Sequence, residues 1–158
     1  MKVLKFGGTS VGSKESIRAV LDIVKKSHDN GEKPLVVLSA MAGVTNLLSK
    51  MADNAAERLS FDADIQYLEE KHFAVVKELI AVKYQNPVLT KLKLMLNDLE
   101  EILHGVFALK ELSPQSKDLI VSFGERFSNY LVSKIMEQYI QDALYIDASH
   151  YVKTDSNF

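Results

Sequence analysis

The sequence predicts an α/β fold with a mainly parallel sheet and a large share of helix. Residues 1–6 and 34–39 each contain a short apolar run, and the segment between them has the apolar spacing of a helix. This strand–helix–strand order is typical of two parallel strands joined by a right-handed crossover. The second strand has four apolar residues in succession, Leu35 to Leu38, so we expect both of its faces to be covered.

The first helix has clear start and stop signals. Ser13 is a suitable N-cap, Glu15 complements the helix dipole in the first turn, and Asn30-Gly31 ends the helix. Its apolar residues fall at positions i, i+3, i+4 and i+7, namely Ile17, Val20, Leu21 and Val24.

Three further apolar stripes predict amphipathic helices that pack against one another and against the sheet. They consist of Leu47, Leu48, Met51, Ala55 and Leu59; of Ile65, Leu68, His72, Val75, Val76 and Leu79; and of Val88, Leu92, Met95, Leu99, Ile102, Leu103 and Val106. Residues 60–64 separate the first two stripes, and Asn86-Pro87 predicts a turn before the third. We interpret His72 as a packed or hydrogen-bonded histidine rather than a ligand.

Another helix is expected to begin at Ser113-Pro114, which fit the N-cap and the first helical position. It carries Gly124, and a glycine inside a helix costs about 1 kcal/mol relative to alanine, so we expect a packing or functional reason for it. Glu125 follows in an apolar neighbourhood, where a partly buried carboxylate needs a partner. That partner is either a cation of the chain, such as Arg126, or the ammonium group of a ligand.

The C-terminal part predicts more strands. Residues 143–148 form a third short strand that ends in an acid, and residues 151–154 form a fourth at an edge of the sheet. Three or four strands are few for this number of helices, so the fold is expected to be only part of a larger one.

The composition narrows the class of protein. A chain of 158 residues with 47% hydrophobic and 25% charged residues is typical of one soluble globular domain. Its net charge of −2 does not support nucleic acid or an anionic membrane as a partner. The chain lacks cysteine, a membrane-length apolar run and a signal peptide, which is compatible with a cytoplasmic protein. No residues have the spacing of a metal site.

A candidate phosphate loop follows the first strand. Lys5 precedes Gly7 and Gly8, whose lack of a Cβ lets a ligand approach the backbone, and Thr9 and Ser10 add hydroxyl donors. A strand–turn–helix of this kind favours an anion, usually phosphate. The sequence matches neither the Walker nor the dinucleotide glycine pattern, and a simple tight turn with a solvated lysine explains it equally well.

A second polar loop, residues 39–46, follows the second strand. Ligands of open α/β sheets bind at the carboxyl ends of the strands, and both polar loops lie there. Small residues, one glycine and three polar side chains make this a loop that a ligand can approach closely. The alternative is that Thr45 or Asn46 only caps the next helix.

Three separated motifs now stand in order: KFGGTSV at residues 5–11, SAMAGVTN at residues 39–46 and SFGERFS at residues 122–128. Their order and spacing closely resemble the aspartokinases of the amino-acid kinase family, and the resemblance covers the whole chain. Residues 147–148 and 154–158 also look like the next motif of that family.

The resemblance implies an ATP-dependent aspartate kinase. Such an enzyme transfers the γ-phosphoryl group of ATP, bound with Mg²⁺, to the β-carboxylate of L-aspartate, at the start of lysine, threonine and methionine biosynthesis. Lys5 would be the catalytic residue, neutralising charge on the phosphoryl group, and Gly7, Gly8, Thr9 and Ser10 would bind phosphate with it. Ser39, Thr45 and Glu125 would bind the substrate, with Glu125 on its α-ammonium group.

The resemblance also implies a partial chain. Residues 1–158 would be the N-terminal, aspartate-binding lobe of a three-layer αβα amino-acid kinase fold. The nucleotide-binding lobe, with its L-G-R-G-G-S-D-like motif, and the regulatory ACT domains have no counterpart in the sequence. We expect this chain to be inactive alone and its parent enzyme, either monofunctional or fused to a homoserine dehydrogenase, to be a homo-oligomer.

Two other functions remain open on the sequence. One is another amino-acid kinase, acting on glutamate, carbamate or a nucleoside monophosphate through the same glycine loop. The other is a non-catalytic domain that binds a small anion or a partner protein.

Overall fold

A two-stranded parallel sheet brings the candidate loops together. The structure, a computed structural model, describes residues 2–152. Strand β1 (Val3–Phe6) pairs with β2 (Leu35–Leu38) in the register Val3↔Leu35 to Phe6↔Leu38. Helix α1 (Lys14–Asp29) connects the two strands, so the predicted strand–helix–strand unit is confirmed.

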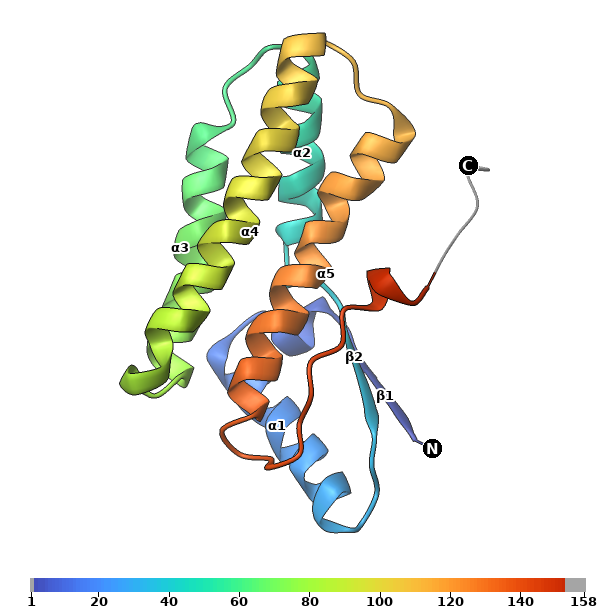
Figure 1. The fold of residues 1–158 in the computed structure, drawn as a ribbon, viewed down its shortest axis with the longest axis vertical. Helices are drawn as coiled ribbons and strands as arrows, with labels where there is room; N and C mark the ends of the chain where they lie inside the picture. The colour runs from blue at the N-terminus through green and yellow to red at the C-terminus, as the bar shows by residue number, and fades with distance from the viewer. Residues whose placement is uncertain (1, 153–158) are drawn as a thin grey trace.

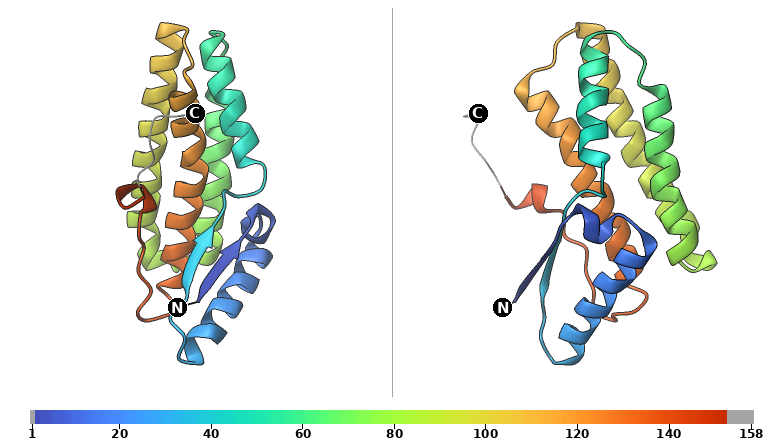
Figure 2. Two further views of the ribbon diagram at one scale, coloured as in Figure 1. Left: turned by 90° about the vertical axis from the view of Figure 1, so that its right-hand side faces the viewer. Right: turned by 180° about the vertical axis from the view of Figure 1, so that it is seen from behind.

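Four long helices form an elongated bundle beside this unit (Figures 1 and 2). They are α2 (Val44–Ala56), α3 (Asp62–Leu79), α4 (Val82–Leu109) and α5 (Pro114–Met136). Two short 3₁₀ turns, η1 (Gly8–Val11) and η2 (Ala148–His150), lie near the ends of the chain. The predicted α/β class, rich in helix and with a parallel sheet, is confirmed.

The predicted helix starts form as expected. The Ser13 hydroxyl accepts a hydrogen bond from the backbone N–H of Ser16 (3.2 Å), and the Ser16 hydroxyl accepts one from the Ser13 N–H (3.0 Å). This reciprocal pair satisfies two donors that would otherwise lack partners at the start of α1. The Ser113 hydroxyl caps α5 in the same way, by accepting from Ser116 N–H (3.1 Å), with Pro114 as the first helical residue.

The predicted stripes form most of the core. Every member of the second stripe is buried, and so is the third except for Ile102, which is partly buried. In the first stripe, Leu47 is partly buried and Leu59 is 51% exposed. Helix α2 ends at Ala56, before Leu59, and the chain turns through a positive φ at Arg58.

The predicted turn at Asn86-Pro87 is wrong, because α4 runs from Val82 through Pro87 without a break. Pro87 is exposed and lies in the second turn of the helix. A proline this close to the start removes only one backbone hydrogen bond, which the buried stripe that follows compensates.

The expectation that both faces of β2 are covered is also wrong for the described residues. Leu38 is buried and Val36 partly buried, whereas Leu35 and Val37 are 45% and 40% exposed. In β1, Val3 is likewise exposed (54%). One face of the sheet packs on the core and the other is open.

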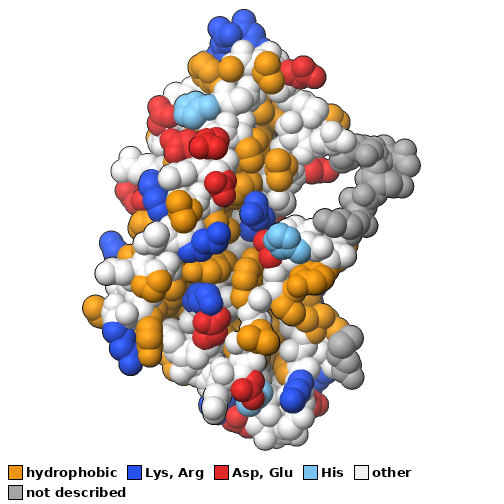
Figure 3. Space-filling model, viewed as in Figure 1, with side chains coloured by type: hydrophobic (Ala, Val, Ile, Leu, Met, Phe, Trp, Pro, Cys, Tyr) orange, Lys and Arg blue, Asp and Glu red, His pale blue; other side chains and the backbone are white. Residues whose placement is uncertain are grey.

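The predicted third strand is wrong as well. Residues 143–147 carry no strand and run beside α5, where the rings of Tyr145 and Tyr130 pack edge-to-face at 5.8 Å. Leu144 and Ile146 are 85% and 59% exposed, and hydrophobic side chains reach the surface along this segment (Figure 3). Of the expected fourth strand, residues 151–152 form no strand and residues 153–154 lie outside the described part of the chain. Within residues 2–152, no helix is long and apolar enough to cross a membrane.

Candidate functional site

The two loops predicted to bind ligand lie against each other at the carboxyl ends of β1 and β2. A Cβ built on Gly8 would lie 2.8 Å from the backbone oxygen of Ala40, and one built on Gly12 would lie 3.0 Å from the Cβ of Ala42. The backbones approach so closely that a side chain at Gly8 would force them apart. The need for glycine here is therefore a matter of loop packing, in addition to any approach by a ligand.

The first loop folds as the 3₁₀ turn η1. Gly7 is extended at its start, and the Ser10 N–H donates to Gly7 O (3.0 Å). Lys5 is exposed and forms no ion pair or hydrogen bond with any residue in the described range 2–152. Thr9 is exposed and Ser10 is partly buried. The loop therefore offers a lysine and two hydroxyl side chains at the end of β1.

The second loop ends in helix α2 without a side-chain cap. Gly43 is the N-cap residue and has a positive φ of 82°, a conformation that glycine adopts without steric cost. Thr45 and Asn46 lie within the first turn and are exposed. The alternative that one of them caps the helix is wrong, and the Thr45 hydroxyl is not used as a cap.

Helix α5 packs on the second loop through Gly124, Glu125 and Ser128 of the SFGERFS segment. A Cβ on Gly124 would lie 2.8 Å from the Cβ of Ala40, so the missing side chain lets the helix approach the loop. One residue on, the Glu125 carboxylate accepts a long hydrogen bond from the Ala40 N–H (3.4 Å). The Ser128 hydroxyl donates to Ser39 O (2.7 Å). The packing reason expected for Gly124 is thus present.

Glu125 has no cation partner among residues 2–152. Arg126, the candidate partner named from the sequence, instead has its guanidinium 4.5 Å from the centre of the Phe123 ring. The Glu125 side chain is partly buried, and Ala40 N–H is the donor it contacts. A carboxylate in this position retains the capacity to accept further hydrogen bonds, for example from an ammonium group.

The predicted site residues are brought together through Ala40. Its backbone oxygen faces Gly8 of the first loop, its N–H faces Glu125, and Ser39 precedes it. Sequence reasoning missed the role of Asn129, whose carboxamide binds both backbone groups of Leu38. The signal was its position one helical turn after Glu125.

A cavity of about 510 Å³ lies elsewhere, between β2, the C-terminal half of α5 and residues 140–146, with a mainly apolar lining. In the described range, no three His, Asp or Glu side chains are placed to hold a metal ion. The exposed Lys5 and the loop hydroxyls suit a phosphate group, but these residues do not provide a site for Mg²⁺.

Two loops meet at the carboxyl ends of parallel strands, with a lysine on one and a carboxylate beside the other. This is the edge of the sheet at which α/β proteins typically bind small molecules. The model of the amino acid kinase family matches residues 1–157, and the chain belongs to this family. The family resemblance predicted from the three motifs is confirmed.

Among curated relatives, the chain is 35% identical to Aspartokinase 3, chloroplastic, of Arabidopsis thaliana over 150 residues, covering 92% of this chain and 25% of the relative. It is 31% identical to Bifunctional aspartokinase/homoserine dehydrogenase 1, chloroplastic, of Zea mays, covering 86% of this chain and 15% of that protein. The chain thus spans at most about a quarter of the length of these two relatives.

Among solved structures, the chain resembles E. coli aspartokinase III in complex with aspartate and ADP, with a TM-score of 0.75 and 30% identity. The match covers 88% of this chain and 29% of that one. The same enzyme in complex with lysine and aspartate also has a TM-score of 0.75, at 29% identity. The amino-acid kinase fold predicted for this chain is confirmed.

Proposed function

We propose that this chain is the aspartate-binding part of an aspartokinase, which transfers the γ-phosphoryl group of ATP to the β-carboxylate of L-aspartate. The observation that carries the proposal is the meeting of Gly8, Ala40 and Glu125. On one side of the short loop at Ala40 lies the glycine loop that follows Lys5. On its other side lies the Glu125 carboxylate, which has no cation partner within residues 2–152.

Each group then has a role that its chemistry supports. The Glu125 carboxylate binds the α-ammonium group of aspartate, and the hydroxyls of Ser39 and Thr45 hydrogen-bond the substrate. Two negatively charged reactants repel each other, so the reaction needs positive charge at the point of transfer. Lys5 supplies that charge. The loop residues Gly7, Gly8, Thr9 and Ser10 orient the phosphates, because phosphoryl transfer depends mainly on positioning and charge stabilisation.

The domain assignment is part of the proposal. Residues 1–158 correspond to the N-terminal lobe of the kinase domain, and catalysis needs a nucleotide-binding lobe as well. The lengths of the relatives support this assignment, as does the open face of the sheet. MgATP, a homo-oligomeric parent enzyme, a cytoplasmic location and a place at the start of lysine and threonine biosynthesis belong to the same proposal.

An NMR titration tests substrate binding directly. The ¹⁵N-labelled chain is titrated with L-aspartate and then with L-glutamate, and amide shifts are followed at Ala40, Thr45 and Glu125. We expect saturable shifts with aspartate only, in the millimolar range, because a partner missing from a charged site typically costs about 2–5 kcal/mol of affinity.

Two variants complete this test. Glu125→Ala removes the carboxylate and is expected to abolish the response. Glu101→Ala removes an exposed helical carboxylate of α4 and is expected to leave it unchanged. Equal shifts with glutamate, or a response that survives Glu125→Ala, would contradict the proposed substrate and the role of Glu125.

A further inference from the structure

We propose that Asn129 is the positioning residue of this site, and that its carboxamide fixes the Ser39–Ala40 backbone relative to Glu125. The inference rests on the proposed function for one point, that Glu125 binds the substrate. That Asn129 holds the Ser39–Ala40 backbone in place is argued from the hydrogen bonds of Asn129 alone.

The carboxamide of Asn129 takes the place of a neighbouring strand at the end of β2. Its Nδ2 donates to Leu38 O (2.8 Å), and its Oδ1 accepts from Leu38 N–H (3.3 Å). The bonds from Leu35 N–H to Lys2 O and from Ser39 N–H to Phe6 O show that alternate residues of β2 face β1. Leu38 therefore faces the other edge, where both of its backbone groups bond to one side chain.

The same carboxamide is tied to the helix turn that carries Glu125. Asn129 Nδ2 also donates to the backbone oxygen of Glu125 (2.7 Å), and the Ser128 hydroxyl donates to that oxygen (3.1 Å) as well as to Ser39 O. The backbone of Glu125 and the backbone of residues 38–39 thus share two side chains as common partners. A shift of α5 along β2 would break the bonds from Asn129 to Leu38 and from Ser128 to Ser39 together.

The position of the Glu125 carboxylate depends on this connection. Its contact with Ala40 N–H is long, at 3.4 Å, and by itself too weak to hold the loop. The shorter bonds of Asn129 and Ser128 act on the two residues before Ala40. They hold the loop at the distance from α5 that the Glu125 contact requires.

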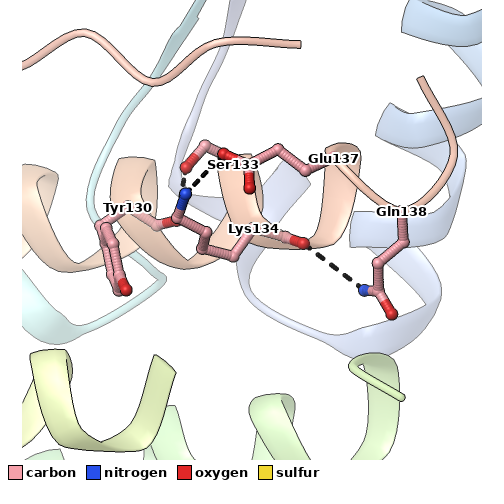
Figure 4. Close-up of polar contacts among 5 residues, drawn as sticks. All are labelled: Tyr130, Ser133, Lys134, Glu137 and Gln138. Carbon is pink, nitrogen blue, oxygen red and sulfur yellow. Dashed lines mark hydrogen bonds and ion pairs between the residues drawn. The ribbon is translucent and has the colours of Figure 1, made fainter. Parts of the chain in front are cut away.

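Gln138 offers a matched control near the C-terminal end of α5. Its Oε1 accepts from Ala81 N–H (2.9 Å), and its Nε2 donates to Leu79 O (3.3 Å). Figure 4 shows its amide also reaching back to the backbone oxygen of Lys134, four residues earlier, as Asn129 reaches Glu125. The two amides make the same kinds of bond, but Gln138 contacts the α3–α4 connection instead of β2.

The test compares Asn129→Ala, Asn129→Asp and Gln138→Ala in the whole 158-residue chain. Urea unfolding first establishes how much each substitution destabilises the fold. Amide chemical shift and hydrogen exchange are then measured at Ala40, and aspartate affinity is measured by NMR titration. Asn129→Asp keeps an acceptor for Leu38 N–H but places negative oxygens against the oxygens of Leu38 and Glu125, so it separates the donor role from side-chain volume.

We expect Asn129→Ala and Asn129→Asp to shift the Ala40 amide, to speed its exchange at least tenfold and to weaken aspartate binding at least fivefold. Gln138→Ala is expected to leave the Ala40 amide shift unchanged, and the Ala40 exchange rate and the aspartate affinity within twofold. This should hold even if Gln138→Ala destabilises the fold as much as Asn129→Ala does. In the double variant Asn129→Ala/Glu125→Ala, the Ala40 shift should equal that of Glu125→Ala alone, because Glu125→Ala already removes the Ala40 contact that Asn129 is proposed to position.

An Ala40 amide that is unchanged in Asn129→Ala, or that changes equally in Gln138→Ala, overturns the inference. A different outcome would separate the two proposals. If the unsubstituted chain does not bind aspartate but Asn129→Ala still changes the Ala40 amide as expected, the proposed function fails and the positioning of Glu125 by Asn129 is supported.

Discussion

The Cβ of Ala40 occupies the space that a side chain at Gly124 would need, with 2.8 Å between the two Cβ positions. Leu48 and Val44 approach the same point, at 3.2 and 3.4 Å. Real Cβ atoms do not come as close as 2.8 Å, and Ala40 has no rotatable side chain with which to move aside. The approach of α5 to the second loop therefore depends on the absence of one methyl group.

We predict that Gly124→Ala destabilises the chain by about 1–3 kcal/mol, through overpacking against Ala40. Helix propensity alone would predict the opposite sign, a gain of up to about 1 kcal/mol. Gly105→Ala is the matched control, because Gly105 lies inside α4 with nothing within 4 Å of its built Cβ. Urea unfolding should show Gly105→Ala as neutral or stabilising, and equal effects of the two variants would contradict the packing explanation.

A buried histidine predicts a loss of stability in mild acid. His72 is 1% exposed, and burial lowers its pKa from 6.5 to about 4, although the bond of its Nδ1 to Leu68 O (2.8 Å) opposes the shift. Its Nε2 has no hydrogen-bond partner among the described residues. The unfolded chain therefore binds this proton at a higher pH than the folded chain does.

This lowered pKa sets the direction in which the stability of the fold depends on pH. The stability that a neutral His72 preserves is fully present above pH 6.5 and is lost as the pH falls towards 4. The loss amounts to about 3 kcal/mol, from a shift of this size at about 1.4 kcal/mol per unit. Unfolding free energies measured from pH 7 to pH 4.5 should fall in the unsubstituted chain and in the control His150→Gln, which changes an exposed histidine. A slope that persists undiminished in His72→Leu would exclude His72 as its cause.

Pro87 interrupts the hydrogen bonds of an exposed helical turn in α4. Pro87→Ala restores a donor to the second turn and removes the contact of the proline ring with the preceding turn. We expect a gain of about 1 kcal/mol, less than the interior value of about 3 kcal/mol because the position is near the helix start. A thermal melt that shows a lower Tm for Pro87→Ala would indicate that the ring makes a stabilising contact outside the helix.

Lys5 should contribute little to folding, because its proposed role is catalytic and belongs to the complete kinase. Its side chain is exposed on β1, so Lys5→Ala is expected to change the unfolding free energy by no more than about 0.5 kcal/mol. The chain alone is expected to give no measurable turnover with MgATP and aspartate, in a coupled assay for ADP. Turnover by this chain that Lys5→Ala abolishes would show that residues 1–158 are sufficient for catalysis, against the proposal.

Local signals in the sequence predicted the helices well. Ser13 and Ser113-Pro114 mark helix starts, because capping involves residues only a few positions apart. One local signal was wrong, because Asn86-Pro87 predicted a turn where α4 continues. The other errors concern long-range structure. Whether residues 143–148 form a strand depends on the edge of β2, and the Asn129 carboxamide already occupies that edge at Leu38. The open face of the sheet likewise depends on which elements pack there and not on the apolar run itself.

In the candidate site too, the sequence indicated the residues of a local motif but not their long-range contacts. The motif containing Gly124 and Glu125 was visible in the sequence, and a packing reason for the glycine is present. The contact from Asn129 to Leu38 joins residues 91 positions apart, and the position of Asn129 one helical turn after Glu125 does not identify such a distant partner. A motif can therefore indicate which residues approach a site, while the residues that hold them in place emerge only from the fold.

The open face of the sheet has a consequence for how the chain loses structure. Helices α2 to α5 bury apolar side chains against one another, whereas the β1–α1–β2 unit packs through only one side of its two strands. Local unfolding begins where few apolar contacts hold the backbone, so β1 and the loop from Gly7 to Val11 should open at lower free energy than α5. Native-state hydrogen exchange would then separate the two halves of the site. We expect the half with Glu125 to remain protected while the half with Lys5 exchanges first.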